Sequence, residues 1–404
     1  MVTILVILSI VLAILAIAQL IRVFEEASKL RGEVSPLPTD SENRYQSKMM
    51  LVFVFSYFAF FAWLTARYGG NLLPVSGSEH GESLDSLLDF NFWVITTVFV
   101  ITHIFLFYFA YKYVYSKDRK ALYYTHSNKL ELLWTGVPAV FLAIIIIFGL
   151  SSWINIMDDA PEGSLTIELY PKQFDWTARY AGADSLIGAA NYNMISTNNP
   201  LGVITKASIA QKVDELNAEI AELQAELANV PKGGIKEEEL NETIAKRERQ
   251  LQRVLAFRSL EPISLAAGDD DVLVKTEFYL PVNKEVNFLF RSRDVIHSAY
   301  MPHFRAQMNC VPGMITKFHF KPVRTTEQMR EITGNDEFDY ILLCNKICGA
   351  AHYNMKMVIK VVEQEEFDKW LSEQKTFAAS IAPAEEQTAV VDAEVSSNIS
   401  MIGK

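Results

Sequence analysis

Residues 338–355 read Phe338-Asp-Tyr-Ile-Leu-Leu-Cys344-Asn-Lys-Ile-Cys348-Gly-Ala-Ala-His352-Tyr-Asn-Met355. The aromatic and aliphatic residues at the start of this stretch are typical of a strand. Two thiols, an imidazole and a thioether follow within twelve residues. Because these soft donors suit copper better than magnesium or calcium, the stretch predicts a β domain that carries a soft-metal loop.

A second cysteine distinguishes this loop from that of a mononuclear blue-copper site, which supplies one Cys, one His and one weak Met. Two thiolates allow two sulfur atoms to bridge two metal ions, and each ion then needs its own imidazole. The loop offers only His352, so a second histidine must come from elsewhere. His297, in Asp294-Val-Ile-His297-Ser298, follows the strand-like run 286–290 and is the candidate.

Two alternatives for the cysteine motif fit less well. A Cys-x3-Cys-x3-His run could bind zinc from one face of a helix, but Gly349 and the preceding strand argue against a helix, and common zinc spacings differ. A thioredoxin-like copper-delivery protein requires alternating strands and helices and a histidine far downstream. The total of three cysteines also argues against a disulfide framework and leaves Cys310 as a small buried hydrophobe.

Apolar and acidic residues are segregated along the 404-residue chain, which is half apolar yet has a net charge of −11. Long apolar runs occupy the first 157 residues, and most of the acidic residues follow them. A helix needs roughly 20 residues to cross the hydrocarbon of a bilayer. By this criterion the chain has four candidate spans, at about 2–21, 49–66, 93–114 and 133–154.

Positive charge predicts the orientation of these spans. The loops 22–48 and 115–132 carry five and four Lys or Arg residues, whereas the loop 68–92 has none and carries four Asp or Glu residues. Both basic loops should face the cytoplasm, which places the N-terminus and the region after Trp153 on the outer face. The first span lacks a basic leader and a clear cleavage site, so we expect it to be retained.

The outer region combines short strands with one helical block. Strand-like runs at 165–170, 272–278, 286–290, 315–320 and 357–362 are punctuated by Gly, Pro and Asn, as in an antiparallel sandwich. Apolar residues repeat at helical spacing before and after Pro231–Gly234, which predicts an antiparallel helical hairpin inserted at about 206–257. Its two arms should pack on each other, and a docking role for its charged outer faces stays open as an alternative.

The predicted chain is therefore membrane-anchored, with N-terminal transmembrane helices followed by an all-β sandwich. We expect an extra transmembrane hairpin at 1–67, a second transmembrane hairpin at 88–157 and the β domain at 160–370, with the helical insertion inside it. Residues 376–404 lack periodicity and are predicted to form a flexible tail.

Several separate motifs resemble those of subunit II of bacterial haem–copper cytochrome c oxidases. The resemblance covers about residues 88–205 and 258–370, and leaves out the first two spans and the helical hairpin. The motifs are Asn128-Lys-Leu-Glu-Leu-Leu-Trp-Thr135, Lys172-Gln-Phe-Asp-Trp176, Asp294-Val-Ile-His297-Ser298, Val311-Pro-Gly313 and the cysteine loop.

This resemblance implies a cupredoxin-like domain with a dinuclear copper (CuA) centre. Cys344 and Cys348 would be the bridging thiolates, and His297 and His352 the terminal ligands. Met355 would be the weak axial ligand of one copper, and the backbone carbonyl of Lys346 would serve the other. Trp176 belongs to the aromatic motif above the copper pair and is a further candidate for a role in electron transfer.

The resemblance also implies the function and its partners. The chain would accept electrons from a c-type cytochrome and pass them to haem in catalytic subunit I, which would hold haem and CuB and couple oxygen reduction to proton pumping. The copper domain would lie on the periplasmic face of a bacterial inner membrane, among other oxidase subunits and lipid, with no nucleic acid partner. Because the chain has no Cys-x-x-Cys-His, the donor must be separate. A donor tethered to the membrane or part of a respiratory supercomplex stays open beside a soluble one.

Two residues depart from the family pattern. The family usually has Glu at the position of Lys346, where the side chain helps to hold magnesium, and an ammonium group cannot be a ligand. The magnesium site is therefore in doubt, and the hypothesis is that the charge of Lys346 replaces part of the missing cation. Phe174 stands where the family usually has the Trp that receives electrons from cytochrome c, and ordinary packing is the alternative role for it.

Glu131 matches the carboxylate at the mouth of the family's proton-uptake path, although it could also be a solvated residue paired with Lys129 or Lys120. His103, inside the third span, is expected to hydrogen-bond a neighbouring helix. Two other classes of protein remain as alternatives. One is a quinol-oxidase relative, which would lack the copper ligands, and the other is a membrane-tethered copper-delivery or storage protein.

Overall fold

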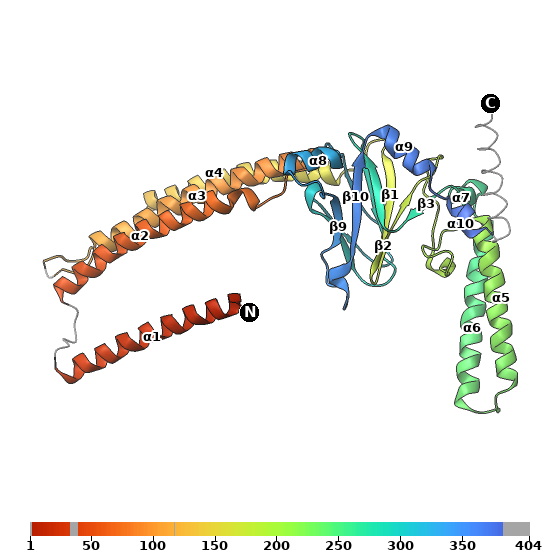
Figure 1. The fold of residues 1–404 in the computed structure, drawn as a ribbon, viewed down its shortest axis with the longest axis horizontal. Coiled ribbons are helices and arrows are strands. Elements are labelled where there is room, and N and C mark those ends of the chain that lie inside the picture. The colour runs from red at the N-terminus through yellow and green to blue at the C-terminus, as the bar shows by residue number, and fades with distance from the viewer. Residues whose placement is uncertain (1, 33–38, 117, 383–404) are drawn as a thin grey trace. The chain divides into compact units, whose positions relative to one another are not determined.

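The computed structural model describes residues 2–32, 39–116 and 118–382 (Figure 1). Four long helices come first, and each contains an apolar window long enough to cross a membrane, as predicted. They extend beyond the predicted spans where polar residues cap them; Thr39, for example, accepts a hydrogen bond from the N–H of Glu42 at 3.2 Å. The helices are α1 (Val2–Leu30), α2 (Asp40–Tyr68), α3 (Glu79–Lys112) and α4 (Asn128–Met157).

Aromatic rings join α2 to α3. Tyr57 of α2 lies 5.9 Å from both Phe99 and His103 of α3, measured between ring centroids. The Nδ1 atom of His103 lies 2.7 Å from the carbonyl oxygen of Phe99, one turn earlier in the same helix. The hydrogen-bond partner of Nδ1 thus lies in the helix of His103 itself, and the ring packs against Tyr57 of the neighbouring helix; a hydrogen bond of His103 to a neighbouring helix stays a prediction.

The outer part of the chain is a sandwich of two five-stranded sheets, as predicted. The strand orders are β3-β2-β1-β5-β8 and β4-β10-β9-β6-β7. The pairs β1–β5 and β4–β10 are parallel, unlike the antiparallel arrangement expected, because long connections separate these strands in the sequence. The bounds are β1 (Leu165–Lys172), β2 (Asp175–Tyr180), β3 (Val272–Val274), β4 (Glu277–Pro281), β5 (Val286–Phe290), β6 (His297–Met301), β7 (Ala306–Cys310), β8 (Thr316–Phe320), β9 (Tyr340–Cys344) and β10 (Lys356–Val362).

Aromatic side chains fill the space between the sheets. Burial alternates along β5 and β9, as a strand with one face on a core requires. Phe304 stacks on Phe320 at 4.8 Å and on Tyr340 at 4.5 Å, so the core is continuous from β8 to β9. This packing fixes the end of β9, where the cysteine loop begins.

The predicted helical insertion is present as α5 (Lys206–Ala228) and α6 (Ile235–Ala256). Apolar residues of the two arms pack on each other, and those at the base join Met194 and Leu265 of the sandwich side in a buried cluster. The short helices α7 (Pro262–Ala266) and α8 (Thr326–Thr333) follow later in the chain.

The acidic first turns of α3, and Ser78 just before it, are bound to the sandwich. Asp85 pairs with Arg305 at 2.7 Å, Glu82 pairs with Arg324 at 2.6 Å, and Glu79 pairs with Lys321. Ser78 donates its hydroxyl to the carbonyl of Phe304 at 2.7 Å. The loop between α2 and α3 is thus held on the same side as the sandwich, which agrees with the predicted orientation.

The last described residues form α9 (Gln364–Ser372) and α10 (Phe377–Ile381). Residues 376–382 therefore differ from the predicted flexible tail. Thr376 accepts a hydrogen bond from the N–H of Ala379 at 3.3 Å, and Phe377 and Ile381, one turn apart, are buried against Tyr170 and its neighbours. Residues 383–404 of the predicted tail lie outside the described residues.

A buried ionic network crosses the outer face of the first sheet. Arg179 of β2 pairs with Glu168 of β1 at 2.7 Å and with Asp271 at 3.0 Å, and Arg291 also pairs with Glu168. Burial opposes ionisation of Glu168, but the two guanidinium groups hold its pKa below the usual range. Burial, only partly offset by Arg179, raises the pKa of Asp271 to about 7. The network is the largest charged group that the described fold buries.

Candidate metal centre

The cysteine loop is closed at both ends by a strand pair. Cys344 is the last residue of β9, and the register pairs Leu343 with Lys356 at the start of β10. The N–H of Cys344 donates to the carbonyl of Met355 at 3.1 Å, so the two ends of the loop are fixed together. Gly349 has a φ of +142°, which excludes the single helical face that a zinc-binding alternative required.

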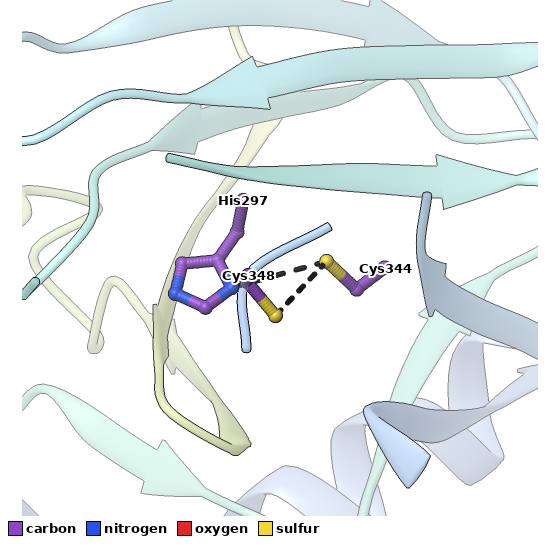
Figure 2. A group of neighbouring side chains, drawn as sticks. All are labelled: His297, Cys344 and Cys348. Atoms are coloured by element: carbon purple, nitrogen blue, oxygen red, sulfur yellow. Dashed lines mark hydrogen bonds between the residues drawn. The ribbon is translucent and has the colours of Figure 1, made fainter. Parts of the chain in front are cut away.

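Three buried ligand atoms converge at this loop. Figure 2 shows His297, from β6, pointing toward Cys344 and Cys348. The two Sγ atoms are 4.0 Å apart, and the Nδ1 atom of His297 lies 3.8 Å from the Sγ atom of Cys344. The structure therefore brings together the loop and the distant histidine, as the sequence predicted.

The other three predicted ligands, Lys346, His352 and Met355, lie next to one or the other of the two cysteine sulfur atoms. At Cys344, the carbonyl oxygen of Lys346 lies 3.3 Å from Sγ, beside His297. At Cys348, the Nδ1 atom of His352 lies 3.5 Å and the Sδ atom of Met355 3.4 Å from Sγ. Each sulfur thus has one imidazole and one weaker donor, and this soft donor set fits copper.

Asp294 orients His297, a role that the sequence reasoning did not assign. One carboxylate oxygen lies 2.9 Å from Nε2 of His297, and the other accepts the N–H of Gln173 at 2.8 Å. Burial opposes ionisation of Asp294, but these hydrogen bonds outweigh it and lower the pKa of Asp294. A carboxylate on one ring nitrogen leaves the other free to bind a metal, so the motif Asp294-x-x-His297 was the available signal.

Cys348, a predicted metal ligand, and Cys310, which is not one, have different surroundings. Burial and the neighbouring Cys344 raise the pKa of Cys348 to about 11, so a bound metal ion has to displace its proton. Burial raises the pKa of Cys310 to about 12. Cys310 lies in β7, outside the cluster of ligand atoms, and is buried among apolar residues, as predicted.

Comparisons with known proteins give the same assignment. Two family models match the chain: Cytochrome C oxidase subunit II, transmembrane domain, at residues 66–152, and its periplasmic domain, at residues 255–362. The chain belongs to the cytochrome c oxidase subunit II family. It is a membrane protein of an oxidase complex, with transmembrane helices, a periplasmic β domain and an electron-transfer site of the CuA kind.

Relatives of the family align over most of the chain. The alternative cytochrome c oxidase subunit 2 of Bradyrhizobium diazoefficiens is 28% identical over 296 residues, which cover 73% of this chain and 81% of that protein. Cytochrome c oxidase subunit 2 of Cereibacter sphaeroides is 23% identical over 307 residues, covering 76% and 80%. The periplasmic domain of subunit II (CoxB) of Bradyrhizobium japonicum, a solved structure, is 18% identical over 53% of this chain and 95% of that one, with a TM-score of 0.27.

Phe174 lies on the surface of the cytochrome oxidase domain, beside the cysteine loop. Its side chain is 37% exposed, and a Cβ atom at Gly349 would approach its ring to 2.8 Å, so the loop needs glycine there. The preceding Gln173 donates to the carbonyl of Cys348 at 2.5 Å. Trp176 is instead buried, with its ring 6.4 Å from that of His297. The two aromatic residues of the motif therefore occupy different environments.

Lys346 is exposed, and Glu131 is half-buried. Next to Lys346 in the loop, Ile347 is 89% exposed. Glu131, in the first turn of α4, lies 2.9 Å from Nδ1 of His126. Its partner among the described residues is therefore His126, which the sequence reasoning did not consider, and not Lys129 or Lys120.

Proposed function

We propose that this chain holds a dinuclear CuA centre, takes electrons from a c-type cytochrome and delivers them to haem in catalytic subunit I, where haem and CuB reduce oxygen. One observation supports this above all: each of the two thiols has its own imidazole, at 3.8 Å for Cys344 and 3.5 Å for Cys348. A single-copper site needs only one such pair. When bound, the copper pair supplies a one-electron carrier.

Each ligand would have a specific task in this proposal. Cys344 and Cys348 would hold the metal ions as thiolates, His297 and His352 would supply the imidazoles, and Met355 and the carbonyl of Lys346 would supply the weaker donors. Asp294 keeps the Nδ1 atom of His297 directed at the cluster. Because the ends of the loop are tied to β9 and β10, the ligands keep their positions when an electron arrives or leaves.

Electron paramagnetic resonance of the purified, copper-loaded chain tests the dinuclear assignment. We expect two copper ions per chain and hyperfine splitting from one electron shared by both. A spectrum of isolated Cu(II), or a zinc-filled silent site, would contradict the proposal. Labile copper on a chain that does not remain with the haem-containing subunits would favour the alternative function of copper delivery or storage.

The bounds and location of the domains form a second part of the proposal. We place the extra transmembrane hairpin at 1–67, the second at 88–157 and the copper domain at 160–370, with the insertion at 206–257, in a bacterial inner membrane. The four apolar helices and the ion pairs that tie residues 73–90 to the sandwich support this arrangement. Alkaline phosphatase should be active when fused after residue 157 and inactive when fused after residue 120.

Phe174 is the proposed point at which electrons arrive, because its ring is partly exposed and lies against Gly349 of the cysteine loop. Trp176 would act indirectly, by packing against His297. Phe174→Ala should slow reduction by a soluble c-type cytochrome about tenfold, equivalent to roughly 1.4 kcal/mol in the barrier. Stopped-flow absorbance at low salt measures this rate. Phe174→Trp is the control variant, and it should keep the rate of the unaltered protein. Equal rates for all three proteins would remove Phe174 from the electron path.

Lys346 is proposed to supply part of the positive charge that magnesium provides in the family. Its ammonium group cannot bind a cation, whereas its backbone carbonyl remains free to serve copper. Lys346→Glu in the whole oxidase should create a site for one Mn²⁺, detected by electron paramagnetic resonance, without loss of copper. Lys356→Glu, at another exposed lysine close to the loop, should not. Stoichiometric magnesium or manganese in the unaltered oxidase would contradict the hypothesis.

Glu131 is proposed as the carboxylate that collects protons on the cytoplasmic side. Its half-buried position at the start of α4, where its ion-pair partner among the described residues is the titratable His126, supports this role. Glu131→Ala should lower turnover by about 10-fold, less than the roughly 100-fold or more typical of a proton-transfer group, because water can partly substitute. Copper content should stay constant. Asp118→Ala is the matched control, and a turnover as high as the control's would exclude the role.

A further inference from the structure

The helical insertion carries a basic stripe outside the regions that define the family. Helix α5 and nearly all of α6 lie between the two matched ranges, 66–152 and 255–362. On α6, Lys246, Arg249, Gln250 and Arg253 are spaced at i, i+3, i+4 and i+7, so they share one face of the helix. The oxidase function of the family does not account for this face.

This face forms one wall of a groove. Tyr192 and Asn193, in the short helical turn Tyr192–Met194, form the other wall, and the groove has a volume of about 310 Å³. Tyr192 is 68% exposed although it is a large aromatic residue. Exposed tyrosine flanked by arginine is the composition that protein interfaces favour over the rest of a surface.

Hydrogen bonds join the two walls of the groove and the base of the hairpin. Gln250 donates to the carbonyl of Asn193 at 2.9 Å, and Arg253 donates to the hydroxyl of Tyr192 at 3.0 Å. At the base of the hairpin, Lys212 donates to the carbonyl of Ile195 at 3.0 Å. A partner would therefore meet a surface that is already ordered, which lowers the entropic cost of binding.

The positive charge of the groove is only partly neutralised. Lys246 pairs with Glu242 at 3.0 Å, and Arg247 pairs with Glu219 at 2.7 Å. Within the described part of the chain, Arg249 meets no carboxylate, and Arg253 reaches only the phenol of Tyr192. Like charges one helical turn apart repel each other. The whole chain has a net charge of −11, so this partly neutralised basic stripe is a locally positive surface on an acidic protein.

We propose that the groove binds a carboxylate-rich segment of another protein in the respiratory membrane. Guanidinium groups bind carboxylates through paired, charge-assisted hydrogen bonds, and Arg249 and Arg253 are one turn apart, so they can hold two acidic side chains of one segment. The exposed ring of Tyr192 provides apolar contact between them. This interaction is independent of copper, so it stands or fails separately from the electron-transfer proposal.

A photo-crosslinking residue tests the proposal in intact membranes. Benzoylphenylalanine replaces Tyr192 in the full chain, and mass spectrometry identifies the crosslinked peptide. We expect one segment rich in Asp and Glu from a different protein. The double change Arg249→Glu and Arg253→Glu should lower the crosslink yield at least tenfold, and raised salt should lower it too, because the charges are exposed.

Three comparisons make the result decisive. Lys232→Glu with Lys236→Glu, at the far end of the hairpin, should leave the yield unchanged, and Arg249→Lys with Arg253→Lys should retain most of it. Unchanged thermal unfolding and copper signal in the charge-reversed protein show that its fold is intact. Crosslinks only to lipid or to residues 383–404 of the same chain, a yield that resists charge reversal, or no crosslink at all would overturn the proposal.

Discussion

Cys348→Ser should abolish the shared-electron copper signal and stop electron transfer through this subunit. Cys348 is the residue on which His352 and Met355 converge, at 3.5 Å and 3.4 Å from its sulfur atom. Serine keeps the shape of the side chain but offers a hard oxygen that is not a thiolate at neutral pH. Since the loss of an outer partner alone costs roughly 10–100-fold in metal affinity, the loss of a bridging ligand should cost more than about 100-fold.

The third cysteine provides a matched control for this substitution. Cys310→Ala removes a sulfur atom from the same domain, but from outside the ligand cluster, so copper content and the shape of the signal should stay constant. Metal analysis and electron paramagnetic resonance of both variants, purified in parallel, make the comparison. Two coppers per chain in Cys348→Ser, or none in Cys310→Ala, would show that the assigned cluster is wrong.

The copper ligands could be predicted because most of them are contiguous in the sequence. Residues 344–355 contain five of the six donors, so a short motif was sufficient, and His297 followed from its own motif. The contacts that position these donors could not be predicted. The hydrogen bond of Gln173 to Asp294 joins a turn after β1 to the segment before β6, and only the packing of the sheets brings them together.

The burial of both faces of β1 could not be predicted from the sequence pattern either. Alternating residues indicate a strand with one buried face, yet residues 167–171 of β1 are buried on both faces. The outer face is covered by α10 and by the residues that lead into the helical insertion, which pack around Tyr170. Glu168, two residues from Tyr170 and so on the same face of the strand, is buried and paired with Arg179.

Arg179→Met should destabilise the copper domain by about 3–5 kcal/mol, because removing one partner of a buried ion pair leaves uncompensated charge. Arg179 is only 2% exposed and serves two carboxylates, those of Glu168 and Asp271. Guanidinium unfolding of the full chain in detergent, followed by near-ultraviolet circular dichroism, measures the change. Arg258→Met, at an exposed arginine, should stay within about 0.5 kcal/mol of the unaltered protein.

The pH dependence of this loss separates a charge effect from a packing effect. Without Arg179, burial should raise the pKa of Asp271 further above its value in the unfolded chain, whereas Arg291 still pairs with Glu168. An acid with a raised folded pKa favours the native state most at low pH, and that contribution disappears as the pH rises through the folded pKa. The loss in free energy of unfolding caused by Arg179→Met should therefore be larger at pH 8 than at pH 5. Lost packing alone would give the same loss at both pH values. A constant deficit, or one below about 1 kcal/mol, would mean that the carboxylates of this network do not depend on Arg179 for their burial.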